Sequence, residues 1–209
     1  MSIGFLFDLD GTLLNTLEDL ADGTNHALAF FGYPRRTLEE VRRFVGNGAA
    51  NLIAQAVPAG RAPAPVLKAF QAYYPTHCRI KTAPYPGVLE ALAELRKKYP
   101  IAIVSNKPDA AVKPLCAHYF PGIFALGETA GCPRKPDPAM VRKAMEAIGV
   151  TDCVYVGDSE VDVLTAKNAG VPCLSVLWGF RDREQIGGSR YCETVDRLVP
   201  TLEEMACGK

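Results

Sequence analysis

Ile3-Gly4-Phe5-Leu6-Phe7-Asp8-Leu9-Asp10-Gly11-Thr12-Leu13-Leu14 is the stretch on which the fold depends. Its first five residues are apolar and rich in aromatics, which predicts a short buried strand. Asp8 and Asp10 follow where that strand stops, and ligands of α/β proteins bind at such strand ends. Being two residues apart, the carboxylates would share one side, and Gly11 lets the backbone turn close to a ligand. We therefore predict an anion and metal site, with a simple surface turn as the alternative.

Composition is that of an ordinary globular protein. The 209 residues allow one domain with an insertion or two small domains, and 48% are hydrophobic. Net charge is zero and the basic residues are scattered, which argues against nucleic acid or an anionic membrane as a partner. No apolar run approaches the ~20 residues of a membrane span, and no signal segment is evident, so we expect a cytoplasmic protein. The seven cysteines, with no Cys-x-x-Cys pair, are expected to be reduced thiols.

The segment 15–83 has a helical pattern throughout and no strand. Thr16 with Asp19, and Thr37 with Glu40, are typical of capped helix starts. Gly46-Asn47-Gly48 interrupts the pattern. We predict about four helices here, followed by a return linker over 82–87.

From residue 87 onward helical and strand patterns alternate in short units, which predicts an α/β fold with a parallel sheet and covering helices. The expected helices are 88–99, 108–119, 138–148 and 160–169, the expected strands are 101–104, 123–126, 153–156 and 172–177, and an edge strand over 191–195 precedes a closing helix over 197–205.

Two further motifs place phosphate-binding chemistry at strand or helix ends. The strand 101–104 is followed by Ser105-Asn106-Lys107-Pro108, where the Ser105 hydroxyl could donate to a phosphoryl oxygen at a helix start. A simple helix cap is the alternative. Lys135-Pro136-Asp137-Pro138 also begins a helix, and the Lys135 charge would balance a carboxylate cluster and hold a phosphoryl group.

Another pair of carboxylates comes after the strand 153–156. Asp158 follows Gly157, and Asp162 lies four residues later, so both can face one point from the start of a helix. Magnesium prefers oxygen ligands and keeps several waters, which suits a few Asp side chains and a phosphate.

Asp8-Leu9-Asp10-Gly11-Thr12-Leu13 resembles the first motif of the haloacid dehalogenase superfamily, in the phosphatase-type members that carry the second Asp. The stretches at Ser105, Lys135 and Asp158 are similar to the second, third and fourth motifs, in the same order. The resemblance implies a Rossmann-like core, residues 1–14 and 84–209, with an inserted α-helical cap, residues 15–83. It covers about residues 3–180.

The resemblance also implies a mechanism. Asp8 would attack phosphorus and form an aspartyl-phosphate, and Asp10 would act as general acid and then general base. Asp8, the Asp10 carbonyl and Asp158 would hold Mg²⁺, with Asp162 in support. The phosphoryl oxygens would be bound by the side chains that the family's motifs supply, namely Ser105, Asn106 and Lys135.

The features of the cap indicate which substrate to expect. Its length, the Val45-Gly46-Asn47-Gly48 turn and the linker 84–88 resemble the phosphoglycolate phosphatase group. Asn47 could bind the polar end of a small ligand, and Arg42 or Arg43 could pair with a carboxylate, although adjacent arginines also suit a solvated face. We expect a small anionic phosphomonoester such as 2-phosphoglycolate as substrate.

Other functions stay open at this point. Pyrophosphate is the closest competing substrate, and a sugar-phosphate phosphatase or mutase of the same superfamily would share the core. The mutases carry a His shortly after the first motif, and residues 17–20 contain none. A non-enzymatic regulator would normally have lost one of the charged residues. The partner is expected to be a small phosphorylated metabolite, and the chain a monomer or homodimer.

Overall fold

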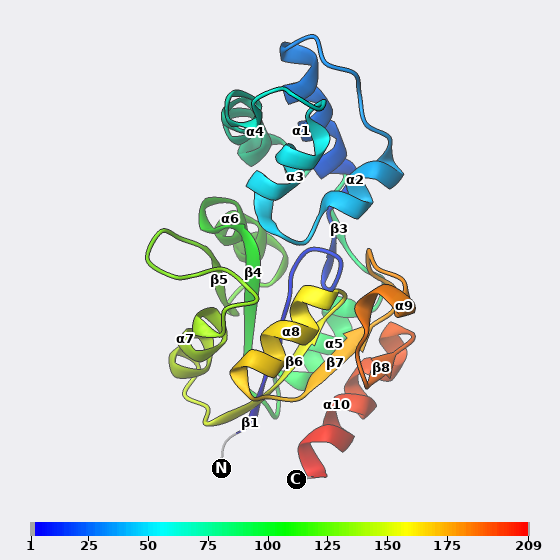
Figure 1. Cartoon of the computed structure of the whole chain (residues 1–209). Coiled ribbons are helices and arrows are strands. Elements are labelled where there is room, and N and C mark those ends of the chain that lie inside the picture. The colour runs from blue at the N-terminus through cyan, green and yellow to red at the C-terminus, as the bar shows by residue number, and fades with distance from the viewer. Residues whose placement is uncertain (1–2, 209) are drawn as a thin grey trace.

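The computed structural model describes residues 3–208. Six parallel strands form one sheet in the order β5-β4-β1-β6-β7-β8 (Figure 1). The strands are β1 Ile3–Phe7, β4 Ile101–Pro108, β5 Phe124–Glu128, β6 Asp152–Gly157, β7 Cys173–Val176 and β8 Tyr191–Cys192. The predicted α/β fold is confirmed.

Strand β1 lies in the middle of the sheet because it is apolar on both faces. It pairs with β4 on one side and with β6 on the other, and Phe7 lies opposite Ile103 and Val156. The chain that follows each of these strands therefore emerges at the same edge. This register brings the sequence after Phe7 next to the ends of β4 and β6.

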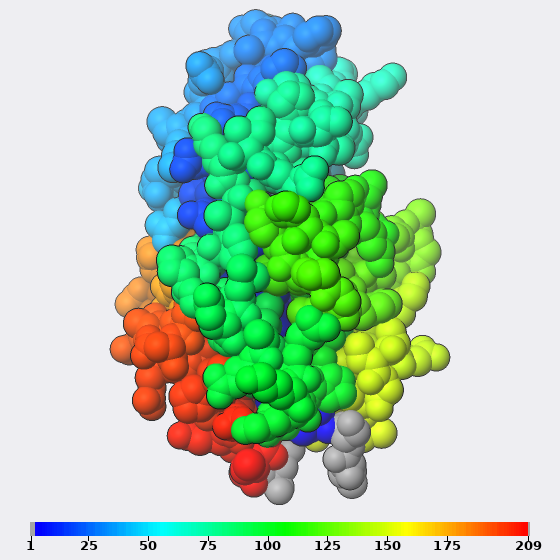
Figure 2. Space-filling view, turned by 180° about the vertical axis from the view of Figure 1, so that it is seen from behind, coloured from blue at the N-terminus to red at the C-terminus, as the bar shows by residue number. Residues whose placement is uncertain are grey.

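Alternate side chains of β1 face two different layers of helices. Phe5 and Phe7 belong to a core that includes α5 Val88–Leu95, α6 Asp109–Tyr119 and α10 Leu198–Cys207. Leu6 belongs to the opposite core, which includes α7 Ala139–Ala147 and α8 Glu160–Ala169. Figure 2 shows the first of these faces from outside, with residues 88–119 in green beneath the blue and teal helices.

Four helices stand beyond the carboxyl edge of the sheet (Figure 1). They are α1 Leu17–Phe30, α2 Leu38–Phe44, α3 Gly48–Ala56 and α4 Pro63–His77. At their base β2 Leu14–Asn15 pairs antiparallel with β3 Ala83–Pro84, so the chain leaves and re-enters side by side. We keep the division into a cap, 15–83, and a core, 1–14 with 84–209, as a proposal, and "cap" below means these four helices.

One of the two predicted helix caps is wrong. Thr37 and Glu40 form the expected capping box, but the Thr16 hydroxyl has no hydrogen-bond partner and does not cap α1. Asp19 instead accepts from the backbone N–H groups of residues 80, 81 and 82 at 2.9–3.1 Å. A buried carboxylate needs such donors, and here they come from the far end of the cap rather than from its own helix.

Several element bounds also differ from the prediction. Strand β4 continues to Pro108, and α5 ends at Leu95. The short helix α9 Arg183–Ile186, which begins at an Asp182–Gln185 capping box, and a 3₁₀ turn at Val195–Arg197 were not predicted.

All seven cysteines are free thiols. Five are buried, Cys173 is half-buried, and Cys207 at the end of α10 is exposed. Within residues 3–208 none of the helices has both the length and the apolar character to cross a bilayer.

Candidate active site

Three buried carboxylates meet at the carboxyl edge of the sheet. Asp8 follows β1, Asp158 follows β6, and Asp162 lies in the first turn of α8, with one oxygen of each within 4.8 Å of the others. Burial and repulsion from the other carboxylates raise the pKa of Asp8 well above its usual range. Burial, followed by repulsion from Asp162, raises the pKa of Asp158 to about 7. Such a cluster favours either protons or a cation.

Glycines create the room for these carboxylates. A Cβ at Gly11 or at Gly179 would lie 2.3 Å from atoms of Asp158, and a Cβ at Gly157 would lie 2.3 Å from Asp162. Gly11 also has a φ of +87°, which L side chains rarely adopt. The backbone thus approaches the carboxylates more closely than any other residue type permits.

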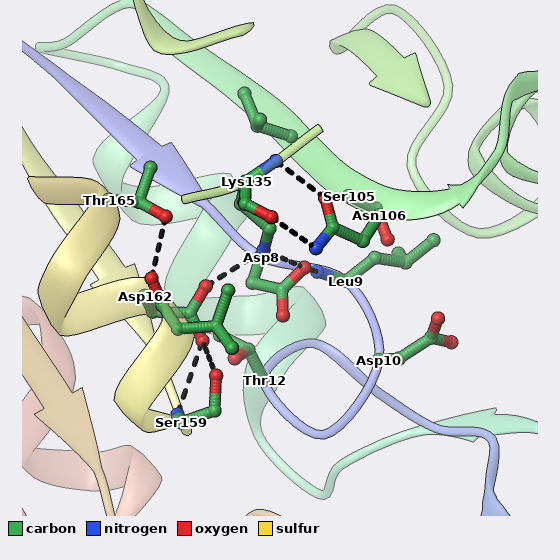
Figure 3. A network of polar contacts seen from close by, with 12 residues as sticks. Asp8, Leu9, Asp10, Thr12, Ser105, Asn106, Lys135, Ser159, Asp162 and Thr165 are labelled. Atoms are coloured by element: carbon green, nitrogen blue, oxygen red, sulfur yellow. Dashed lines mark hydrogen bonds and ion pairs between the residues drawn. The ribbon is translucent and has the colours of Figure 1, made fainter. Parts of the chain in front are cut away.

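Lys135 provides the positive charge of the cluster. Its Nζ lies 2.9 Å from Asp8 Oδ1 and 2.8 Å from Asp162 Oδ1 (Figure 3). The other oxygen of Asp162 accepts from the Ser159 hydroxyl at 2.6 Å and from the Ser159 N–H at 3.2 Å. The second of these bonds belongs to a capping box at the start of α8. The two carboxylates raise the pKa of Lys135 despite its burial, so it stays charged. Asp162 therefore fixes Lys135 against Asp8.

The two polar residues at the end of β4 have different surroundings. Ser105 faces the cavity that Asp8 lines, and its oxygen accepts from the Lys107 N–H at 3.2 Å. Asn106 accepts from the Lys135 N–H at 2.8 Å and donates to the Lys135 carbonyl at 3.0 Å and the Gly46 carbonyl at 3.2 Å. Its amide hydrogens are thereby used, so the geometry suits a residue that positions Lys135 and the cap loop.

Thr12 joins the first loop to the last motif. Its hydroxyl donates to Asp158 Oδ1 at 3.1 Å, while its carbonyl accepts from Trp178 Nε1 at 3.0 Å. The other oxygen of Asp158 accepts from the Phe180 N–H at 2.7 Å. The segment after β7 therefore takes part in the site, although the sequence motifs there were weak.

Asp10 lies apart from the other carboxylates, on the loop after β1 (Figure 3). Lys107 Nζ is 3.0 Å from its Oδ1 and 3.2 Å from its Oδ2, and also donates to the Tyr74 hydroxyl at 2.8 Å. Lys107 and Tyr74 are both buried; burial lowers the pKa of Lys107, but its contacts with Asp10 and Tyr74 outweigh this and raise it. The sequence analysis missed both residues, and the Ser-Asn-Lys-Pro motif was the one available signal for Lys107.

A cavity of about 50 Å³ lies between the cap and the core. The core supplies Asp8, Asp10 and Ser105 to its walls, and the cap supplies mainly apolar groups. The cap residues are Leu20, Val45, Gly46, Gly48, Ala49, Leu52, Phe70 and Tyr74.

Arg43 and Asn47, the cap residues predicted to bind the substrate, differ in their position relative to this cavity. The Arg43 side chain is 67% exposed and pairs with Glu39 at 3.2 Å, so it is not brought to the site. Asn47 directly precedes α3, and its neighbours Gly46 and Gly48 line the cavity.

Arg181 holds the cap loop from the core side. Its guanidinium donates to the carbonyls of Arg42 at 2.8 Å, Arg43 at 3.3 Å and Val45 at 2.5 Å. It also pairs with Glu160 at 3.3 Å. These carbonyls end α2, where a helix leaves its last C=O groups without partners.

Comparison with known proteins agrees with this arrangement. The model of the haloacid dehalogenase-like hydrolase family matches residues 5–176. The chain belongs to this family. Within the family it is 36% identical to a phosphoglycolate phosphatase of Pseudomonas putida over 97% of this chain and 80% of that one. It is 34% identical to a phosphoglycolate phosphatase of Vibrio parahaemolyticus over 96% and 94% of the two chains.

Solved structures of haloacid dehalogenase-like hydrolases share the fold. One from Lactobacillus delbrueckii subsp. bulgaricus, assigned provisionally as a phosphoglycolate phosphatase, is 36% identical with a TM-score of 0.89 and covers 95% of this chain and 97% of its own. CbbY from Rhodobacter sphaeroides, solved in complex with phosphate, is 25% identical with a TM-score of 0.77 over 97% and 100%. The resemblance to the phosphatase-type members is thus confirmed.

Proposed function

We propose that this protein is a magnesium-dependent phosphomonoester hydrolase that acts through an aspartyl-phosphate on Asp8, with 2-phosphoglycolate as its substrate. The observation that carries the proposal is the position of Asp8. It lies at the end of β1 and lines the cavity between the cap and the core, with Lys135 and Asp158 on the core side and Asp10 two residues further along the same loop. The names of the relatives support the same substrate.

The donor set fits Mg²⁺. All candidate ligands are oxygens, which hard cations prefer. The raised pKa values of Asp8 and Asp158 mean that a bound cation would relieve their repulsion. Asp8, Asp158 and the Asp10 carbonyl would hold the ion, and Asp162, occupied by Lys135 and Ser159, would support them. When bound, Mg²⁺ would stabilise the charge on the phosphoryl oxygens.

The contacts of Asp8 distinguish its two oxygens. Oδ1 accepts from the Leu9 N–H at 2.7 Å and from Lys135 at 2.9 Å, which leaves Oδ2 as the attacking atom. Oδ2 forms the bond to phosphorus as the bond to the leaving oxygen breaks, and Asp10 gives that oxygen a proton. Lys135 and the Ser105 hydroxyl face the transferred group.

The second half of the reaction returns the enzyme to its starting state. Asp10, now a carboxylate, removes a proton from a water molecule that attacks phosphorus. The bond from phosphorus to Asp8 breaks, and inorganic phosphate leaves. The cap covers the intermediate, so that water enters only at the position that Asp10 controls.

The small cavity and its apolar cap wall favour a small substrate. The test is a comparison of kcat/KM with Mg²⁺ for 2-phosphoglycolate, pyrophosphate, a hexose phosphate and a nucleoside monophosphate. We expect 2-phosphoglycolate to be the best by at least about tenfold, a difference of about 1.4 kcal/mol. A hexose phosphate or nucleotide that is cleaved tenfold better would contradict the substrate while leaving the phosphatase reaction intact.

A further inference from the structure

We propose that Lys107 and Tyr74 form a subsite for the carboxylate of the substrate, next to the general acid Asp10. This inference deepens the proposed function and rests on it. The two residues come from different parts of the chain, Lys107 from the end of β4 in the core and Tyr74 from α4 in the cap. Both line the cavity.

Lys107 is placed to bind a second anionic group. It is the one cationic side chain in the wall of this cavity within residues 3–208, and it is only 6% exposed. A buried ammonium needs compensating charge, and Asp10 supplies it at 3.0 Å. Leu20, Leu52 and Phe70 of the cap give the cavity an apolar wall opposite the polar groups of the core. When Asp10 carries the proton that it gives to the leaving oxygen, Lys107 loses its anionic partner, and a substrate carboxylate can take that place.

Tyr74 adds a hydrogen-bond donor that has no acceptor. Its oxygen accepts from Lys107 Nζ at 2.8 Å, so its own hydrogen is free for another partner. No acceptor for it occurs in the part of the chain that the structure describes, residues 3–208. The hydroxyl is buried and its pKa is raised by desolvation, so it keeps that hydrogen. An oxygen of a bound carboxylate would satisfy it.

The distance between the subsite and Asp10 selects the length of the substrate. Asp10 must reach the oxygen that bridges phosphorus and carbon, and Lys107 is in direct contact with Asp10. A carboxylate that touches Lys107 must therefore lie within a few bonds of the bridging oxygen. A carboxylate on the same carbon as the phosphoryl group meets this requirement, and one at the end of a longer chain does not.

Two other cations of the site are not available for this role. Lys135 is engaged by Asp8 and Asp162, and Arg43 is exposed and paired with Glu39. The subsite also needs the cap in contact with the core, because Tyr74 reaches Lys107 across the cavity. The carboxylate is therefore bound only when the cap is closed on the core.

Binding of non-hydrolysable analogues tests the subsite without turnover. Calorimetry with Mg²⁺ compares 3-phosphonopropionate, which keeps the carboxylate and replaces the bridging oxygen by carbon, with 3-hydroxypropylphosphonate, which lacks the negative charge. We expect the carboxylate to bind roughly 10- to 100-fold more tightly to the wild type. Lys107→Met should remove most of that ratio, and Tyr74→Phe should lower it about fivefold.

Matched controls are Lys113→Met and Tyr73→Phe, which change the same residue types outside the cavity. Both control variants should keep the wild-type ratio of the two phosphonate affinities. They should also keep the wild-type ratio of kcat/KM for 2-phosphoglycolate to kcat/KM for 2-hydroxyethyl phosphate. If Lys107→Met weakens both phosphonates equally, or if the wild type does not distinguish them, the subsite is wrong. The proposed function fails separately, when the wild type does not hydrolyse 2-phosphoglycolate or cleaves larger esters better.

Discussion

Asp8 is the residue on which the proposed chemistry depends, and its charge can be removed without changing its shape. We expect Asp8→Asn to lower kcat by at least about 10³-fold, because the amide does not attack phosphorus. The variant should melt at or above the wild-type temperature in chelator, since burial of the Asp8 charge is unfavourable. Steady-state kinetics and thermal melts measure the two effects. Asp196→Asn, an exposed change, is the control, and wild-type kcat in Asp8→Asn would refute the mechanism.

Gly11 permits a separate test of the carboxylate cluster. Gly11→Ala places a Cβ 2.3 Å from Asp158 and strains a φ of +87°, whereas Gly32→Ala strains a φ of +68° with no atom within 4 Å. Both variants should lose about 1 kcal/mol of stability through backbone strain. Only Gly11→Ala should also lose activity and the dependence on Mg²⁺. Equal activity in the two variants would show that the close approach to Asp158 is dispensable.

The residues that the sequence could predict are those within its short motifs. Asp8 directly follows β1, Asp158 directly follows β6, Ser105 lies in the second half of β4, and Lys135 lies in the turn before α7. The parallel sheet brings these positions together at one edge. Their proposed roles stay predictions. The contact of Lys107 with its partners spans 97 and 33 residues, and no local pattern encodes it.

Hydrophobic periodicity predicts a helix or strand correctly where the residues of that element alone determine its buried face and its ends. Helix α8 has the predicted bounds, residues 160–169, because Ser159 and Gly170 mark its ends. Asp19 was misread since the same residue type that closes a local cap can equally accept distant N–H groups. Only the three-dimensional path of the cap decides between these partners.

Arg181 connects the core to helix α2, and we expect it to hold the cap closed. Arg181→Leu should reduce kcat/KM about tenfold and speed hydrogen exchange over residues 42–48, because the carbonyls of the α2 end lose their donor. Arg183→Leu is the control, as Arg183 pairs with Glu193 on the surface. Unchanged exchange over 42–48 in Arg181→Leu would contradict a closing role.

The whole molecule should respond to pH through the carboxylate cluster. The pKa of Asp158 rises from 3.8 to about 7 on folding, so its neutral form stabilises the metal-free fold fully below pH 4, and this contribution is lost as pH rises to 7. At 1.36 kcal/mol per pKa unit the loss is about 4 kcal/mol. About two of these three pKa units fall between pH 5 and pH 8, so in chelator the melting temperature should fall by roughly 5–10 °C over that range.

Magnesium and a neutral variant separate this effect from other titrations. Mg²⁺ should restore stability at pH 8 in the wild type, because it binds the ionised carboxylates of the folded state. Asp158→Asn should show a smaller pH dependence in chelator and no gain from Mg²⁺. Calorimetric melts at both pH values measure this, and a full magnesium response in Asp158→Asn would place the cation elsewhere.

The positions of the thiols leave one cysteine, at one end of the molecule, open to reaction with added reagents. Burial raises the pKa of the Cys173 thiol to about 12, and the five other internal cysteines are shielded, so Cys207 is the accessible nucleophile. It ends α10, on the opposite side of the sheet from the cap (Figure 1). A maleimide linker at this position would attach the native protein to a surface or a fluorophore with its cap facing the solution. Single-molecule recordings of lid motion would then need no engineered cysteine on the core.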